Sequence, residues 1–158
     1  MPNILLPSDL VYRVIDPEHR DERGPLAIAF EDPNKPYEGQ SFFVARAARP
    51  LDALNALAKF ARARKLCGTA NRPATPREMY LNGYRIAAIP AAFLLEAIAK
   101  TSRNPQPIAI IAASGEDYGP DGHMDLRNAR HYGASLARAS TILPEADTLD
   151  ERPSIGPC

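Results

Sequence analysis

The segment EDYGPDGHMDL, residues 116–126, holds the densest group of side chains that could do chemistry in this sequence. Asp117, Asp121, His123 and Asp125 lie within nine positions of one another. In an extended segment Asp121, His123 and Asp125 would project to one side, and carboxylates and imidazole are suitable metal ligands. A calcium loop starting at Asp117 would lack the bidentate Glu at its last position, so the sequence does not favour calcium.

A simpler interpretation of the same segment is a loop followed by a helix cap. Its glycines and proline are typical turn formers. Asp125 precedes a helix predicted from Leu126, and its carboxylate would accept a hydrogen bond from an otherwise unpaired backbone N–H of the first turn. We favour this interpretation, which assigns no metal to the segment. His123 stays a candidate ligand-binding residue, because an unperturbed imidazole titrates near pH 6.5, at about physiological acidity.

The composition indicates an ordinary globular chain. Its 158 residues suit one domain, and 45% of them are hydrophobic and 24% charged. Lys and Arg number 19 and Asp and Glu 19, giving a net charge of +0, so no general positive field attracts nucleic acid or an anionic membrane. These values favour neither a nucleic-acid partner nor a membrane.

The cysteines and the N-terminal residues indicate a cytoplasmic protein. Cys67 and Cys158 do not have the spacing of metal ligands, and two such distant cysteines suit a reducing compartment. The first residues, MPNILLPSDL, lack the basic start of a signal peptide. No apolar run approaches the roughly 20 residues that span a bilayer.

Periodicity and punctuation by 16 prolines predict short elements. Alternation in LVYRVI, residues 10–15, predicts a strand that carries Tyr12 on one face and Arg13 on the other. The other predicted elements are strands at 26–30, 41–47, 83–90 and 107–114, helices at 51–65, 91–100 and 126–143, and a loop at 69–78.

This order of elements predicts an α+β fold. We expect a single domain over residues 1–143, in which two to three helices pack on a mixed β-sheet. Residues 144–158 are acidic and contain three prolines, so we expect them to form a flexible C-terminal tail.

Two resemblances accompany these predictions. LVYRVIDP, LAIAF, QSFFVA and GHMDLRNARHYGASLA are similar to the pattern lyR.v.p…s.aF…lSV with a late histidine-containing helix, found in short uncharacterised bacterial proteins. That resemblance covers much of the chain and implies no activity.

The second resemblance is to RES-type and other ADP-ribosyltransferase-like toxins. Their first strand often carries a Tyr-Arg pair that reaches the dinucleotide, and Tyr12 and Arg13 are similar to that pair. The resemblance implies that Ser41 stands for the hydroxyl on a later strand and that NAD is the cofactor. The G-R-[WF] signature expected after the first strand is missing, and the catalytic glutamate is left open between Glu78 and Glu96.

Two hypotheses follow. The first is a small bacterial protein-binding or regulatory module without catalysis or cofactor of its own, for which a conflict or defence system is the setting we consider. The alternative is an NAD-using ADP-ribosyltransferase-like or NAD-hydrolysing toxin, so the question of an enzyme stays open. The ligand-binding candidates are Tyr12, Arg13, Ser41 and His123.

Overall fold

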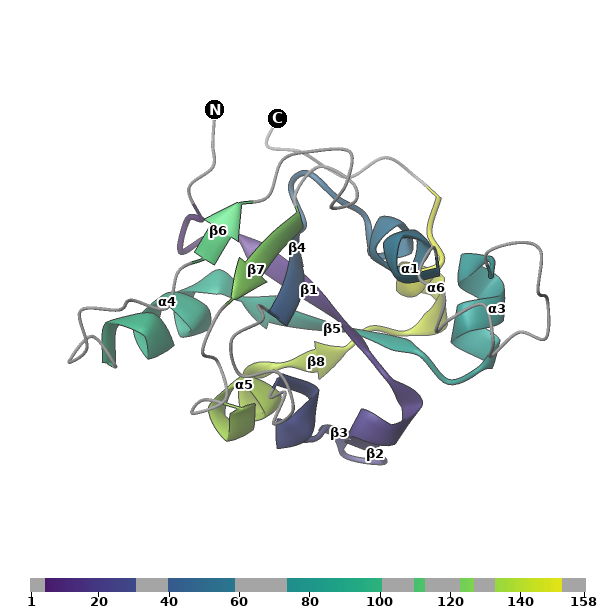
Figure 1. The fold of residues 1–158 in the computed structure, drawn as a ribbon, viewed down its shortest axis with the longest axis horizontal. Helices are drawn as coiled ribbons and strands as arrows, with labels where there is room; N and C mark the ends of the chain where they lie inside the picture. The colour runs from purple at the N-terminus through teal and green to yellow at the C-terminus, as the bar shows by residue number, and fades with distance from the viewer. Residues whose placement is uncertain are drawn as a thin grey trace.

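The computed structural model of the chain describes residues 5–30, 40–58, 74–100, 110–112, 123–126 and 133–151. Its centre is a six-stranded sheet of order β6-β7-β4-β1-β5-β8, in which every described pair of strands is antiparallel (Figure 1). The strands are β1 (Leu10–Ile15), β4 (Gln40–Val44), β5 (Arg85–Pro90), β6 (Ile110–Ala112), β7 (His123–Leu126) and β8 (Thr141–Ile142). A small separate ladder joins β2 (Arg20–Asp21) and β3 (Gly24–Pro25).

Helices cover both faces of the sheet. The α-helices are α1 (Pro50–Ala58), α3 (Pro76–Leu81), α4 (Ala91–Lys100), α5 (Gly133–Ala139) and α6 (Glu145–Thr148), and η1 (Pro17–His19) and η2 (Ala27–Phe30) are 3-10 helices. In Figure 1, α1, α3 and α6 gather on one side of the molecule, with α4 and α5 on the other. The α+β prediction is therefore confirmed, with the short helices α3 and α6 in addition to those expected.

The central strand β1 divides the core in two. Because side chains alternate along a strand, its odd and even positions face opposite helix layers. Val11 and Ile15 pack with Phe42 under η2, α4 and α5, and we call this side the α4 face. Tyr12 and Val14 pack with buried residues of α1 and α3 on the other side, the α1 face.

The central position of β5, with helices on both faces of the sheet, explains why its sequence is almost entirely apolar. Ile86, Ala87, Ala88 and Ile89 are all buried, since helices cover both sides of this strand. Tyr12 lies opposite Ala88, and Arg13 opposite Ala87. Burial on both faces fixes this register, because a slip by one residue would exchange the two sets of side chains.

Helix α3 occupies part of the expected loop 69–78, so that prediction is wrong from Pro76 onward. The local reason is a capping box: the Thr75 hydroxyl accepts a hydrogen bond from Glu78 N at 3.2 Å, and the Glu78 carboxylate accepts from Thr75 N at 3.2 Å. Pro76 at the first helical position suits this start. Residues 69–73 lie outside the described residues.

The predicted strand 26–30 is wrong, because the backbone turns into η2. Ala29 and Phe30 of this turn are both buried in the cluster on the α4 face. Ala29 N donates to Leu26 O at 3.0 Å, which closes the turn.

The predicted helix 126–143 is wrong at both ends. Leu126 is the last residue of β7, the helix α5 starts only at Gly133, and Thr141–Ile142 form β8. Pairing of β7 with both β4 and β6 decides the extended conformation, and it is not visible in the local periodicity. Residues 127–132 lie outside the described residues, as do 59–65 of the predicted helix 51–65.

Part of the segment predicted as a C-terminal tail packs on the domain. Residues 145–148 form α6, and the Thr148 side chain is fully buried. Leu149 packs against the cluster on the α1 face. Thr148 and Leu149 therefore add to the core, whereas residues 144–147 and Glu151 are exposed, and residues 152–158 lie outside the described part.

Candidate functional site

The sheet separates two of the four candidate residues. Tyr12 and Arg13 are neighbours in β1, so Tyr12 lies on the α1 face and Arg13 on the α4 face. The alternation predicted from the sequence is observed. A ligand on one face cannot contact both side chains as a pair.

Arg13 makes contacts within the fold. Its Nε donates a hydrogen bond to Ala29 O at 2.7 Å, and its guanidinium carbon lies 5.5 Å from the centre of the Phe42 ring. The first contact ties β1 to η2, and the second is a cation–π interaction with a ring of the core. Phe42 in turn stacks on Phe30, with ring centres 6.4 Å apart.

Tyr12 is partly buried between the sheet and the helices of the α1 face. Burial raises the pKa of its phenol above 10.0, and the negative charge of Asp147 raises it further. Both causes disfavour the phenolate, so Tyr12 stays neutral and able to donate a hydrogen bond at physiological pH.

The backbone places Ser41 and His123 on two neighbouring strands. Ser41 lies opposite Asp125, and His123 lies opposite Phe43, which itself lies opposite Tyr12. These register positions belong to the same face of the sheet as Tyr12. Three of the four candidates thus occupy positions on the α1 face, and Arg13 does not.

The predicted helix cap at Asp125 is wrong. Asp125 lies within β7, between Ser41 of β4 and Ile111 of β6, and Leu126 continues the strand. His123 and Asp125 are therefore in the extended conformation that the metal interpretation required, while Asp121 lies outside the described residues. Among the described side chains, no group of three or more His, Cys, Asp and Glu is placed to hold a metal ion.

The two glutamates considered for catalysis lie on different helices. Glu78 belongs to the capping box of α3, and Glu96 is exposed on α4. Since α3 covers the α1 face and α4 the opposite face, they do not share a site.

Sequence reasoning missed three arginines that bind backbone carbonyls. Arg20 donates through Nε and Nη2 to Gly83 O at 3.1 and 3.0 Å, and Arg85 donates to Tyr80 O and Tyr84 O at 2.8 Å each. Arg49 donates to Glu151 O at 2.6 Å. The preference for arginine over lysine was visible in the sequence, but its partners lie up to 102 residues away along the chain.

The comparisons with known proteins leave the family open. The chain matches no protein-family model, and it is similar to neither a curated protein nor a solved structure. In the described part of the chain, no helix is both long and apolar enough to cross a membrane.

Proposed function

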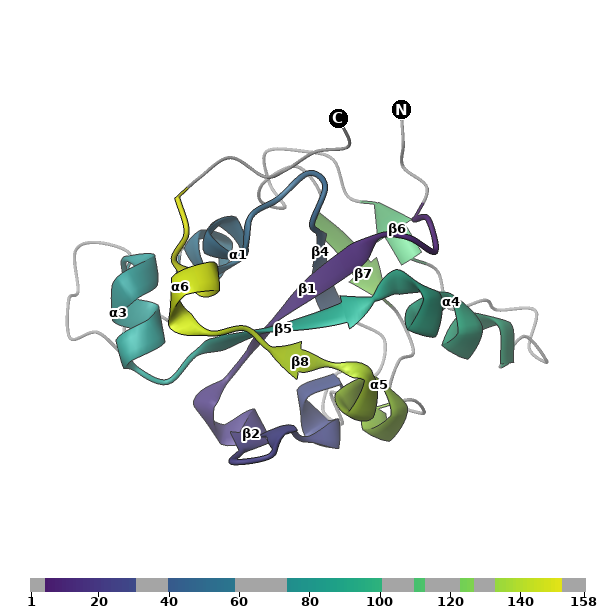
Figure 2. The same cartoon turned by 180° about the vertical axis from the view of Figure 1, so that it is seen from behind.

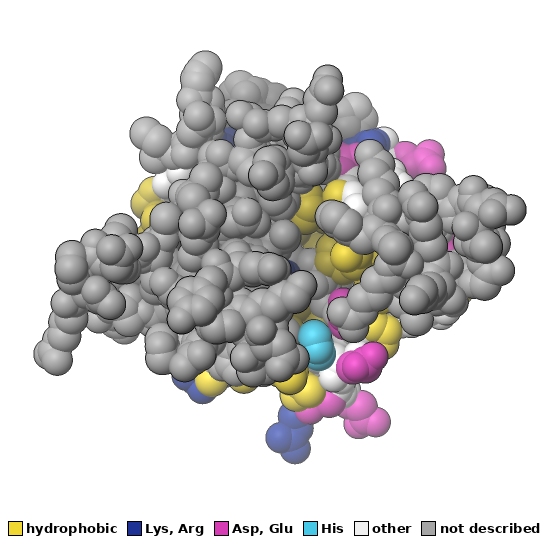
Figure 3. All heavy atoms as spheres, in the orientation of Figure 1, with side chains coloured by type: hydrophobic (Ala, Val, Ile, Leu, Met, Phe, Trp, Pro, Cys, Tyr) yellow, Lys and Arg dark blue, Asp and Glu magenta, His cyan; other side chains and the backbone are white. Residues whose placement is uncertain are grey.

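We propose that this domain is a protein-binding or regulatory module without catalysis of its own. The supporting observation is that large apolar side chains are exposed on three segments that meet at one end of the sheet: the residues before β1, the start of β1 and the first turn of α4. Leu6 is 45% exposed, Leu10 36% and Phe93 50%. We call these three residues with Pro90 the apolar end. Hydrophobic side chains also reach the surface beside charged ones at the lower edge of Figure 3, by β2 and β3.

Backbone contacts hold the segments of the apolar end together. Leu10 of β1 lies opposite Pro90, the exposed last residue of β5, and α4 begins at the next residue. Ala91 N donates to Asp9 O at 2.8 Å, and Leu6 N donates to the Asp9 carboxylate at 2.7 Å. Because these segments are already fixed in the free domain, a partner that binds there would lose little conformational entropy in ordering them.

The Asp9 carboxylate is also fixed from its other side. Arg46 Nε lies 3.2 Å from it, and the Asp9 side chain is only 7% exposed. Asp9 therefore acts as the structural anchor of the apolar end. The charge of this ion pair lies next to the apolar side chains, in keeping with the mixed composition of transient interfaces.

The alternative function, an NAD-using transferase or hydrolase, is less well supported. It assigns Arg13 to the dinucleotide phosphates and Tyr12 or Ser41 to the ribose of the same ligand. The Nε of Arg13 is bonded to Ala29 O, and Arg13 lies across the sheet from the other two positions.

A capture experiment with matched variants tests the binding function. Phe93→Ser removes the most exposed side chain of the apolar end, whereas Leu81→Ser changes a residue that is 72% exposed at the end of α3. We expect a partner that wild type and Leu81→Ser retain and that Phe93→Ser loses by more than tenfold, as for a central interface residue. Equal retention by both variants would remove the support for this surface.

Two measurements separate the outcomes. Size-exclusion chromatography coupled to light scattering identifies a second copy of the chain as the partner. Incubation of the purified chain with NAD tests the alternative: release of nicotinamide would favour the enzyme and contradict the proposal.

A further inference from the structure

The residues after β8 lie over the α1 face and end beside the start of α1. Leu143 N still donates to Ile86 O at 2.9 Å, and the chain then turns into α6, which packs beside α1 (Figure 2). We call residues 144–151 the C-terminal strap. We propose that this strap is a latched cover, which opens while the sheet stays folded, and that Arg49 is its latch. This inference does not depend on the proposed binding function.

The carboxylate of Asp52 fixes the orientation of the Arg49 side chain. Its Nε and Nη2 donate to the two oxygens of the Asp52 carboxylate at 3.0 and 2.8 Å, and its backbone N donates to the same carboxylate at 2.9 Å. This two-pronged contact fixes the plane of the guanidinium. The remaining Nη1 then donates to Glu151 O at 2.6 Å.

The charges around Arg49 favour the latched state. The pKa of Arg49 is raised above its usual range, first by the hydrogen bond and charge of Asp52 and then by the negative Glu151 and Asp150. The last two carboxylates belong to the strap itself. Closing of the strap therefore brings acidic residues toward a cation that is already oriented.

Few side chains of the strap are buried against the rest of the domain. Thr148 is fully buried, and its hydroxyl donates to Pro144 O at 2.9 Å, within the strap. Leu149 packs against the α1-face cluster to which Tyr12 also belongs. Residues 144–147 are all exposed, so little apolar area holds the strap down.

The described backbone-to-backbone hydrogen bonds of the strap join residues of the strap itself, unlike those between the strands of the sheet. Thr148 N donates to Pro144 O at 3.0 Å, and Leu149 N to Glu145 O at 2.9 Å. Lifting the strap leaves the pairing of β1 with β5, from Leu10 to Ile15, intact. Segments with few buried apolar contacts and local bonds open at lower free energy than the core.

Hydrogen exchange of the full chain tests the latch. Arg49→Lys keeps the positive charge but cannot form the fork that orients Nη1. We expect the amides of Thr148 and Leu149 to exchange about tenfold faster, as for loss of a charge-assisted hydrogen bond, while the amides of β1 and β5 stay unchanged. Nitration of Tyr12, mapped by mass spectrometry, should rise in the same variant.

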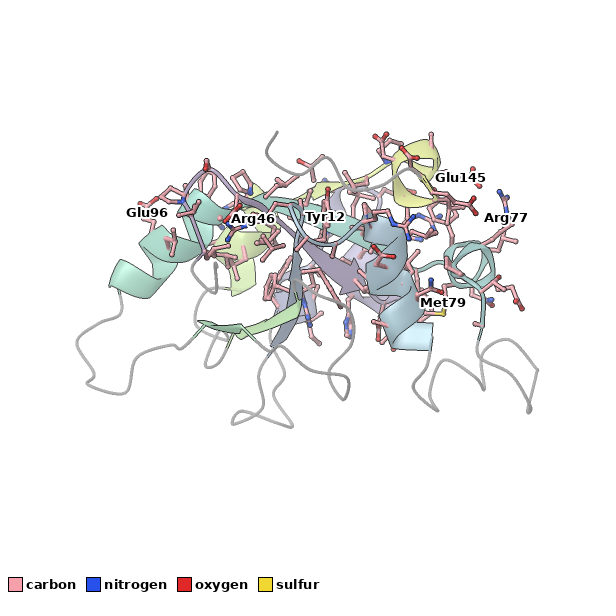
Figure 4. All side chains as sticks on the ribbon, turned by 90° about the horizontal axis from the view of Figure 1, so that it is seen from above. Tyr12, Arg46, Arg77, Met79, Glu96 and Glu145 are labelled. Atoms are coloured by element: carbon pink, nitrogen blue, oxygen red, sulfur yellow. The ribbon has the colours of Figure 1, made fainter. Side chains whose placement is uncertain are left out.

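A second ion pair at the other end of the strap supplies the control. Arg77 of α3 and Glu145 of α6 lie side by side in Figure 4, but their N–O distance is 3.9 Å and their side chains are 70% and 54% exposed. Arg77→Lys should therefore change strap exchange less than twofold. Asp52→Asn, which weakens the fork from its other side, should accelerate it as Arg49→Lys does.

Two results would overturn the proposal. If Arg49→Lys and Asp52→Asn leave the strap amides unchanged, Arg49 is no latch. If strap and β1 amides accelerate by the same factor, the strap opens only with the whole domain and is not a separate cover.

Discussion

Replacement of Arg13 by alanine distinguishes a structural arginine from a ligand-binding one. The guanidinium joins β1 to η2 through the 2.7 Å hydrogen bond from Nε to Ala29 O, and it lies over the Phe42 ring. Arg13→Ala removes both contacts and leaves the Ala29 carbonyl without this donor. We therefore expect the variant to lose stability even in the absence of any ligand.

The expected loss is about 2 kcal/mol. A hydrogen bond from a charged donor contributes about 1.5 kcal/mol or more, which we reduce to about 1 because Arg13 is only partly buried. The cation–π contact adds about 0.5–1 kcal/mol. Arg13→Lys keeps the charge over the ring but not the Nε donor, so its loss should be about 1 kcal/mol.

Urea unfolding monitored by circular dichroism measures these differences from the midpoints at constant slope. Arg77→Ala is the matched control, because the Arg77 side chain is 70% exposed and its removal should cost less than about 0.5 kcal/mol. If Arg13→Ala costs no more than Arg77→Ala, the structural role assigned to Arg13 is refuted. A stable Arg13→Ala protein that has lost NAD turnover would instead favour the enzymatic alternative.

Three further substitutions test other parts of the fold. Gly83→Ala should cost about 1–2 kcal/mol in urea unfolding, because φ is +97° and the new Cβ would lie 3.0 Å from Pro17 Cβ; wild-type stability would contradict this conformation. Thr75→Ala should cost about 1 kcal/mol by loss of its cap, with Thr75→Ser as the near-neutral control; equal melting temperatures of all three proteins would argue against the cap. The Arg49 hydrogen bond lowers the pKa of Asp52 below 3.8, so this carboxylate contributes stability above pH 3.8 that is lost as the pH falls through the folded-state pKa. The stability difference between wild type and Asp52→Asn should thus shrink on acidification, and a difference independent of pH would contradict the ion pair.

Local signals were sufficient where one short segment carries the whole pattern. Residues 10–15 alternate, and β1 is observed as Leu10–Ile15; Pro90 precedes the helix predicted at 91–100, and α4 is observed as Ala91–Lys100. Proline geometry and the period of side chains act within these segments, so no distant partner is needed to specify them.

Contacts between distant segments decided the elements that the sequence did not reveal. The sequence predicted residues 123–125 as the end of a loop with a helix cap and Leu126 as the first helical residue, but pairing with β4 and β6 makes residues 123–126 a strand. The five residues 26–30 form too short an apolar run for periodicity to separate a strand from a turn of 3-10 helix. In both cases tertiary packing outweighs a weak local preference.

The candidate residues show the same division. The placement of Tyr12 and Arg13 on opposite faces followed from alternation alone and was predicted. The partner of Arg13, the carbonyl of Ala29, depends on how η2 folds back over the sheet and has no sequence signature. Likewise, the register that sets Ser41 opposite Asp125 joins residues too far apart in the chain for spacing to reveal.

In the part of the chain that the structure describes, the two outer strands of the sheet are the shortest, with three residues in β6 and two in β8. An outer strand presents unpaired backbone groups on which another chain can grow, and the number of such groups rises with its length. With two residues, β8 offers few of them, and β3 lies alongside it. The β8 edge, where the structure describes the residues on both sides of the strand, therefore resists edge-to-edge stacking into fibrils, although the central strands are rich in the residues that form them.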